Sequence, residues 1–273
     1  MVDHYLLRSS KKRKATVLRY ELDIPEHWNV DLLKTGVFHS MSKPTVEILK
    51  TEDERYQSVL QYFFKGMSSS AAAASVKVLS IEHVQSIKSF MKYSLEAHAM
   101  MEEYGTSCFE KNKFERFLWH GTSISNVDPI LVNGFDKGMI KRNIYGKGFY
   151  FARDASLAAV FAKKNVIDSF HMNAAKSKLS FVGPVECHGE ETQVAMLCRV
   201  LVGRVHYANV KEHEKNVPIK GFHSTSNTKC SCLDEGGLVV SYYENYVYPE
   251  FLVFFKALPE APVHAAQASI GGS

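Results

Sequence analysis

The chain has 273 residues, of which 45% are hydrophobic and 23% are charged, as in an ordinary globular protein with one large domain. Its formal net charge of +4 does not favour a nucleic-acid ligand, because that function needs Lys and Arg clustered on one face. No apolar run is long enough to span a bilayer, the first residues do not form a signal peptide, and five scattered cysteines do not form a disulfide scaffold. We therefore expect an intracellular protein, nuclear or cytoplasmic, that does not act at a membrane.

The two ends of the chain are expected to lie outside the folded domain. Residues 1–24 form a basic, flexible arm, in which "KKRK" at 11–14 is either a nuclear import signal or solvated charge. Residues 259–273 are predicted to be a disordered tail. Residues 25–258 between them are predicted to form a single domain.

The first part of this domain has mainly helical patterns. Residues 44–50 alternate as a strand does, and residues 51–67 have apolar side chains at helical intervals. Thr51 and Glu54 have the spacing of a capping box at the start of this helix. The low-complexity residues 68–75 predict a flexible loop.

A second helix is predicted for residues 81–104, and after it the pattern changes. Short apolar runs then alternate with glycine-containing turns, at 117–123, 148–152, 195–206 and 238–255. Asp154 is predicted to cap a short helix over 155–164. Helices followed by strands predict the α+β class.

Several common sites are excluded or disfavoured by their missing residues. "YGKGFYFA" has Gly146 and Gly148 but lacks both the third glycine of a dinucleotide fingerprint and the Gly-Lys-Ser/Thr end of a phosphate loop. The chain has no G-x-S-x-G nucleophile motif. Two groups of potential zinc ligands fall short of four ligands at the usual spacing: Cys230 and Cys232 with His223, and Cys187 with His188. We expect incidental thiols there and no metal.

"FLWHGTS" is a stronger candidate for a functional site. His120 ends an apolar run, and Gly121 after it allows a ligand to approach the backbone closely. A histidine at a strand end is most often structural, but here "YGKGFYFARDASLAAVF" follows with Tyr150 and Phe161. A histidine donor, exposed glycine backbone and two aromatic rings form a plausible slot for a flat polar ring.

Several motifs together resemble a known family. "WHGTS", "NGFD", "YGKGFYFARDAS", "CRVLVG" and "YPEFLV" have the order and spacing of the poly(ADP-ribose) polymerase (PARP) catalytic domain, the diphtheria-toxin-like ADP-ribosyltransferases. The resemblance covers residues 25–257 and is closest to the mono-ADP-ribosylating members. It implies an α+β fold of split antiparallel β-sheets flanked by helices, which holds NAD, the substrate, in a cleft between the two sheets.

The resemblance also assigns roles to individual residues. It implies that His120 bonds ribose hydroxyls of NAD, that the Gly121 backbone pairs with the nicotinamide carboxamide, and that Phe161 stacks on nicotinamide. Tyr150 corresponds to the tyrosine of the family's His-Tyr-Glu triad. Residues 136–144 correspond to the loop that covers NAD.

Further contacts with NAD are implied for Thr122 and Tyr145, and for Arg142 at the pyrophosphate or adenosine. Ala158 stands where many members have a serine that holds the carboxamide. Ser156 is near in sequence but on another face of its helix, so the resemblance leaves the carboxamide to the backbone.

The third triad position raises the question of Glu244. The family's glutamate precedes the aromatic residue of "PEYL" by thirteen residues, and the same count back from Phe251 of "PEFL" reaches Leu238. Glu244 then lies in a hairpin turn, where a carboxylate is ordinarily solvated. The predicted triad is His120, Tyr150 and Leu238.

Leucine cannot stabilise an oxocarbenium-like transition state or activate a hydroxyl nucleophile. The main hypothesis is therefore a mono-ADP-ribosyltransferase that modifies proteins, itself included, and does not build polymer. The alternative is an inactive PARP-like module that binds NAD, ADP-ribose or a protein. A monomer is expected, with residues 221–237 on the side of the cleft where protein acceptors bind, and nucleic-acid binding has only "KKRK" to support it.

Overall fold

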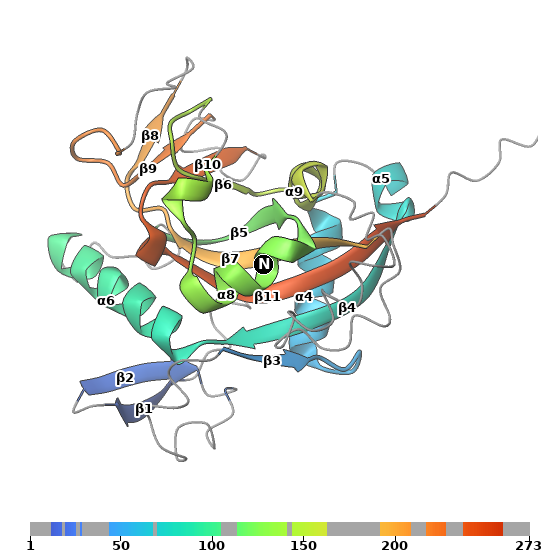
Figure 1. The fold of residues 1–273 in the computed structure, drawn as a ribbon, viewed down its shortest axis with the longest axis horizontal. Coiled ribbons are helices and arrows are strands. Elements are labelled where there is room, and N and C mark those ends of the chain that lie inside the picture. The colour runs from blue at the N-terminus through green and yellow to red at the C-terminus, as the bar shows by residue number, and fades with distance from the viewer. Residues whose placement is uncertain are drawn as a thin grey trace, which may run out of the picture.

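The computed structural model describes residues 12–17, 20–25, 28, 44–67, 70–104, 114–140, 144–162, 192–208, 217–227 and 237–258. Within them, nine strands form one sheet and a short antiparallel hairpin, β1 (Lys12–Val17) with β2 (Tyr20–Pro25), forms a second (Figure 1). The large sheet contains β3 (Thr45–Ile48), β4 (Val76–Gln85), β5 (Glu115–Thr122), β6 (Phe149–Ala152), β7 (Gln193–Leu201), β8 (Val205–Tyr207), β9 (Ser224–Ser226), β10 (Leu238–Ser241) and β11 (Val247–Ala257). The helices are α4 (Glu54–Lys65), α5 (Ser70–Ala74), α6 (Ile87–Tyr104), α8 (Val127–Asn133) and α9 (Ala155–Phe161), with 3-10 turns η1 (Ile124–Asn126), η2 (Lys137–Met139) and η5 (Glu244–Tyr246).

The strand order of the large sheet is β3-β4-β11-β7-β5-β6-β10-β9-β8, antiparallel except for β8 with β9. The predicted α+β class is confirmed. The expected split is visible as a weak junction rather than a full separation, because β5 and β6 are joined by the single register pair Trp119 and Ala152. The sheet therefore consists of two parts that meet at this pair.

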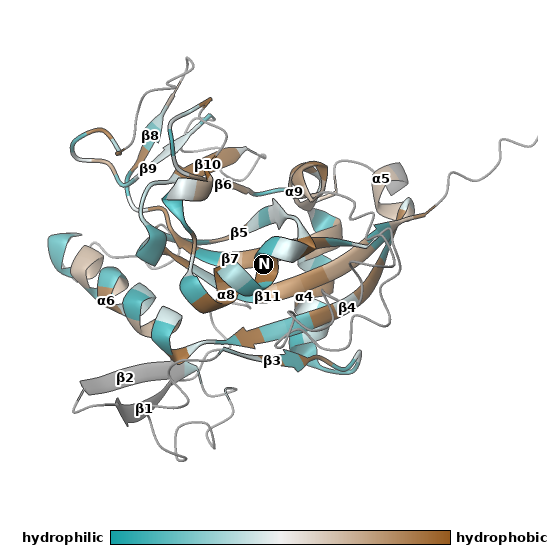
Figure 2. Cartoon of the chain, in the orientation of Figure 1, coloured by the Kyte–Doolittle hydropathy of each residue, from teal (hydrophilic) through white to brown (hydrophobic). Residues whose placement is uncertain are grey.

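The central strands are buried on both faces, which explains their nearly continuous apolar sequences. All nine residues of β7 are buried, and alternate residues such as Met196 and Leu197 belong to two different core clusters. One cluster includes Val127 and Leu131 of η1–α8, and the other includes Phe63 of α4 and residues of α9. Figure 2 shows hydrophobic residues concentrated along β11 and α9.

Helix α4 begins two residues later than a capping box at Thr51 would place it. The N-cap is Asp53, whose carboxylate accepts a hydrogen bond from the Arg55 amide at 2.8 Å. Thr51 instead donates its hydroxyl to Glu52. The predicted capping box is therefore wrong, because Asp53, directly before the first helical residue, caps the helix in place of Thr51.

Two other predictions of local structure differ from the structure. The helical pattern over 81–104 begins too early, because residues up to Gln85 form β4 and α6 starts only at Ile87 after the cap Ser86, whose Oγ accepts from the Ser89 amide. Residues 81–85 of β4 are all buried, on both faces of the strand, so polar and apolar residues do not alternate there as they do in a half-exposed strand. The expected loop at 68–75 contains α5 (Ser70–Ala74).

A buried ionic cluster fixes α6 to the sheet. Arg199 of β7 donates to both carboxylate oxygens of Glu250 on β11 and to Glu115 at the start of β5 at 3.4 Å. The Tyr93 hydroxyl of α6 donates to the same Glu115 at 2.6 Å. These four side chains are almost completely buried, so the cluster joins α6 and three strands in one arrangement.

No helix in the described part of the chain is long and apolar enough to cross a membrane.

Candidate active site

The end of β5 has an open backbone edge. β5 pairs with β7 along its whole length but with β6 only at Trp119 and Ala152. The Arg153 amide donates a hydrogen bond to the Gly237 carbonyl, on the side of β10. Successive residues of a strand direct their backbone groups to opposite edges, so the N–H and C=O of Ala152 face β5. Because backbone groups alternate between the edges of a strand, Gly121 has the same edge as Trp119. At Gly121, β6 no longer pairs with this edge, and Gly121 lines a cavity. The N–H and C=O of Gly121 therefore face that cavity.

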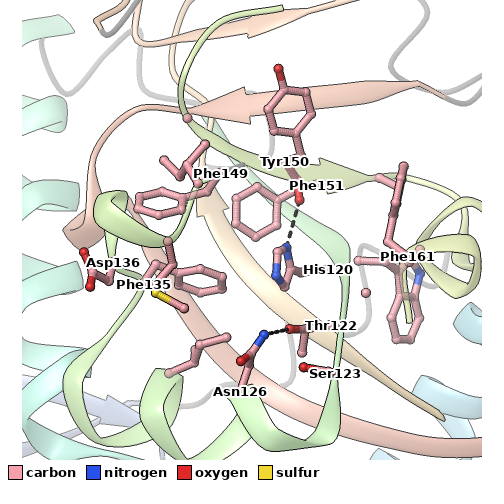
Figure 3. A pocket seen from close by; sticks show the side chains of 18 of the residues that line it. His120, Thr122, Ser123, Asn126, Phe135, Asp136, Phe149, Tyr150, Phe151 and Phe161 are labelled. Atoms are coloured by element: carbon pink, nitrogen blue, oxygen red, sulfur yellow. Dashed lines mark hydrogen bonds between the residues drawn. The ribbon is translucent and has the colours of Figure 1, made fainter. Parts of the chain in front are cut away.

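His120 is held by one hydrogen bond and two aromatic rings. Its Nδ1 lies 2.9 Å from the backbone oxygen of Tyr150, and its ring packs against Phe135 at 5.0 Å and Phe151 at 5.5 Å (Figure 3). A carbonyl can only accept, so Nδ1 carries the proton and Nε2 is the acceptor of the neutral ring. Burial lowers the pKa of His120, which favours this neutral form. His120 is thus prepared to accept a hydrogen bond from a ligand hydroxyl.

A cavity of about 680 Å³ surrounds these residues. Its polar lining residues in the described part of the chain are His120, Thr122, Ser123, Asn126, Asn133, Asp136, Tyr145 and Tyr150. Asp136 is the one carboxylate among the described lining residues, and it is exposed and accepts from the Gly138 amide at 2.7 Å. The cavity therefore offers hydrogen-bond donors and acceptors, with little negative charge near His120.

Leu238 and Glu244 lie in different places. Leu238, at the start of β10, pairs in register with Ala152 and lines the cavity together with His120. Glu244 begins the 3-10 turn between β10 and β11, is exposed, and is not among the lining residues. The position beside the cavity thus carries an apolar side chain.

Helix α9 forms the wall on the other side of β5. A Cβ added to Gly121 would lie 1.8 Å from the carbonyl oxygen of Ala158, so this contact requires glycine. Gln193 of β7 donates its amide to the Ala162 carbonyl at 2.5 Å and so anchors the end of α9. Phe161, near that end, lines the cavity, as does Ala158.

The remaining predicted residues are placed as follows. Thr122 is buried, and its Oγ1 accepts from the Asn126 amide group at 3.1 Å (Figure 3). Ser156 is absent from the described cavity lining, and its amide instead donates to the Gly66 carbonyl at 3.2 Å. Arg142 lies outside the described residues, as do Cys187, His188, Cys230 and Cys232. The described residues contain no group of His, Cys, Asp or Glu suited to a metal ion.

The Tyr150 side chain acts apart from its backbone. Its ring points away from His120, and its hydroxyl donates to the Gly146 carbonyl at 2.8 Å and accepts from the Tyr145 amide at 2.9 Å (Figure 3). Burial raises the pKa of this hydroxyl, so it remains a donor at neutral pH. Tyr145 itself lines the cavity, so Tyr150 shapes the site through a neighbouring turn.

Some residues of the site were not predicted from the sequence. Asn126 is a polar residue in a short turn, where Asn is common for local reasons. Gln193 looks like the first polar residue before an apolar strand. Only its hydrogen bond to the end of α9 in the folded structure shows that Gln193 supports the site.

Comparison with known proteins defines the family. The model of the poly(ADP-ribose) polymerase catalytic domain matches residues 53–256, and the chain belongs to this family. Among individual relatives, it is 24% identical to human protein mono-ADP-ribosyltransferase PARP12 over 233 residues, which are 84% of this chain and 27% of that protein. It is 26% identical to human protein mono-ADP-ribosyltransferase PARP11 over 240 residues, 86% of this chain and 64% of that protein. It is 30% identical to mouse protein mono-ADP-ribosyltransferase PARP10 over 117 residues, 42% of this chain and 12% of that protein. The chain thus spans from about an eighth to just under two thirds of these relatives.

Proposed function

We propose that the protein is a mono-ADP-ribosyltransferase, which transfers one ADP-ribose unit from NAD to protein side chains. The observation that carries the proposal is that His120, Gly121 and Tyr150 line one cavity together with the apolar Leu238. We assign Leu238 to the position of the family's catalytic carboxylate. Relatives described as mono-ADP-ribosyltransferases support it. We also propose that residues 25–258 form the single catalytic domain.

The chain's own groups would bind the donor end of NAD. Nε2 of His120 accepts a hydrogen bond from a ribose hydroxyl. The unpaired backbone N–H and C=O of Gly121 bond the nicotinamide carboxamide. Phe161 supplies a stacking face beside Gly121 and Ala158, without a serine hydroxyl. Thr122 and Tyr145 line the same cavity, and Arg142 would meet the phosphates or adenosine.

The reaction would use the acceptor's own charge. The bond between ribose C1′ and nicotinamide nitrogen breaks, and nicotinamide leaves with the bonding electrons. A carboxylate oxygen of the acceptor protein then bonds to C1′ and forms an ester, so no base is needed. Extension of a chain needs a ribose hydroxyl to lose its proton, and Leu238 cannot promote that. One unit per acceptor site is therefore the expected product.

The test is transfer of label from radiolabelled NAD by purified protein, alone and with a cell lysate. Wild type is compared with His120→Ala and Tyr150→Ala, with folding of each checked by circular dichroism. We expect discrete labelled bands for wild type, and less than about a tenth of that rate for His120→Ala, because a hydrogen bond and a packed ring are lost. Glu244→Gln is the matched control and should keep full activity.

The outcomes separate the hypotheses. Long ladders from wild type would contradict transfer of single units. Loss of activity in Glu244→Gln would contradict the assignment of Leu238 to the third position. Binding of a nicotinamide analogue without any transfer would favour the inactive NAD-binding module, to which Ala158 and Leu238 give some support.

A further inference from the structure

The turn from Tyr145 to Gly148 connects the expected NAD-covering loop to β6. Tyr145 and Gly148 both line the cavity, so the position of this turn sets part of the cavity wall. Its backbone is held by side chains from outside the turn. Tyr150, as described, binds the Tyr145 amide and the Gly146 carbonyl.

A second tyrosine holds the same turn from the other side. Tyr242 follows β10 directly and is completely buried. Its hydroxyl donates to the Tyr145 carbonyl at 3.1 Å and lies 2.9 Å from Oγ1 of Thr225 on β9. A tyrosine hydroxyl has one proton, so Thr225 is the donor in the second bond. The result is a chain of hydrogen bonds from β9 through Tyr242 to the cavity wall.

Gly146 allows the ring of Tyr242 to approach the turn. Its φ is +114°, a conformation that favours glycine, and a Cβ there would lie 2.4 Å from the Tyr242 hydroxyl. The turn and the tyrosine are thus closely matched. Two tyrosine hydroxyls together bind the Tyr145 N–H, the Tyr145 C=O and the Gly146 C=O.

We propose that Tyr242 is a positioning residue of the donor site, which with Thr225 holds Tyr145 in the geometry that NAD requires. The identity of the ligand rests on the proposed function, whereas the control of the turn by Tyr242 does not. Since β9 lies in the segment expected on the acceptor side, the same bonds connect that side of the cleft to the donor site.

Tyr248 provides a matched control. It is also almost completely buried, and its hydroxyl donates to the Val84 carbonyl at 2.8 Å and accepts from the Ser86 amide. It is absent from the described lining of the cavity. Tyr248→Phe therefore removes a buried hydroxyl with two partners, as Tyr242→Phe does, at a place where only stability should change.

The experiment has two readouts on the full chain. Hydrogen exchange followed by mass spectrometry measures protection of a peptide that covers residues 144–150. We expect faster exchange there in Tyr242→Phe and in Thr225→Val, and unchanged exchange in Tyr248→Phe. NAD affinity, measured by calorimetry, should fall about fivefold in Tyr242→Phe, which corresponds to the loss of about one buried hydrogen bond. It should stay at the wild-type value in Tyr248→Phe.

The two readouts fail independently. Wild-type exchange of residues 144–150 in Tyr242→Phe would overturn the positioning role, whether or not the protein uses NAD. An equal loss of NAD affinity in both tyrosine variants would also overturn it, because stability alone would then explain the effect. Faster exchange in a protein that binds no NAD would uphold the control of the turn and overturn the link to the donor site together with the proposed function.

Discussion

Replacement of Glu82 by glutamine should stabilise the protein at neutral and basic pH. Glu82 of β4 is 1% exposed, lies opposite Leu252 of β11 in the sheet, and its Oε2 makes no hydrogen bond to the described residues. Burial raises the pKa of this carboxyl from 4.5 to about 7, despite a hydrogen bond with Ser80. The folded protein therefore holds a proton that the unfolded chain has already released.

The sign and size of the effect follow from this difference. Between pH 4.5 and about 7 the unfolded state binds fewer protons at Glu82, so the free energy of unfolding falls as pH rises through this range. Below this range Glu82 is protonated in both states and adds no pH dependence. At roughly 1.4 kcal/mol per pKa unit, the loss above pH 7 is about 3 kcal/mol. A glutamine side chain does not titrate, so the Glu82→Gln variant should avoid most of this loss.

Urea unfolding at pH 5, 6, 7 and 8 measures the effect. The difference in free energy of unfolding between Glu82→Gln and wild type should grow with pH and level off above 7. Glu244→Gln, at an exposed turn, is the control and should follow wild type at every pH. Parallel curves for wild type and Glu82→Gln would show that Glu82 is ionised in the folded protein and refute the reasoning.

Two other substitutions test the packing around the site. Gly121→Ala places a methyl group against the Ala158 carbonyl and should cost about 1–3 kcal/mol of stability and abolish binding of nicotinamide analogues; unchanged calorimetric affinity would mean that α9 is not fixed there. Arg199→Met leaves buried carboxylates without their cation and should cost about 3–5 kcal/mol in urea unfolding, whereas Arg55→Met, at a more exposed ion pair, should cost about 1 kcal/mol or less. Similar costs for the two arginines would contradict the buried character of the Arg199 cluster.

The fold class and the family could be predicted because they depend on patterns within short segments. "FLWHGTS" and "GFYFA" are strands with glycine at points of close approach, and Gly121 meets the α9 backbone in the structure. β4 could not be distinguished from a helix, because Glu82 and His83 are buried polar residues and the strand lacks polar alternation. A strand segment that is buried on both faces does not show the alternation of a half-exposed strand in its sequence.

The site was predictable only in part, because its contacts use backbone atoms and distant partners. Sequence motifs identify His120 and Tyr150, but not that the carbonyl of Tyr150, rather than its hydroxyl, bonds the histidine. Gln193 reaches the end of α9 across 31 positions of the chain, and no local pattern reports such a contact. Tyr242 looks like another aromatic residue of an apolar strand.

The geometry suggests why a leucine at position 238 is compatible with an intact donor site. His120 is oriented by the backbone of Tyr150, and the turn at Tyr145 is held by the hydroxyls of Tyr150 and Tyr242. Neither arrangement uses the side chain of residue 238, which packs against the core cluster around Trp119. Under the proposed function, an apolar residue there supplies no charge beside the ribose of NAD but leaves these contacts in place. Under the proposed function, donor binding and polymer formation would therefore depend on different residues.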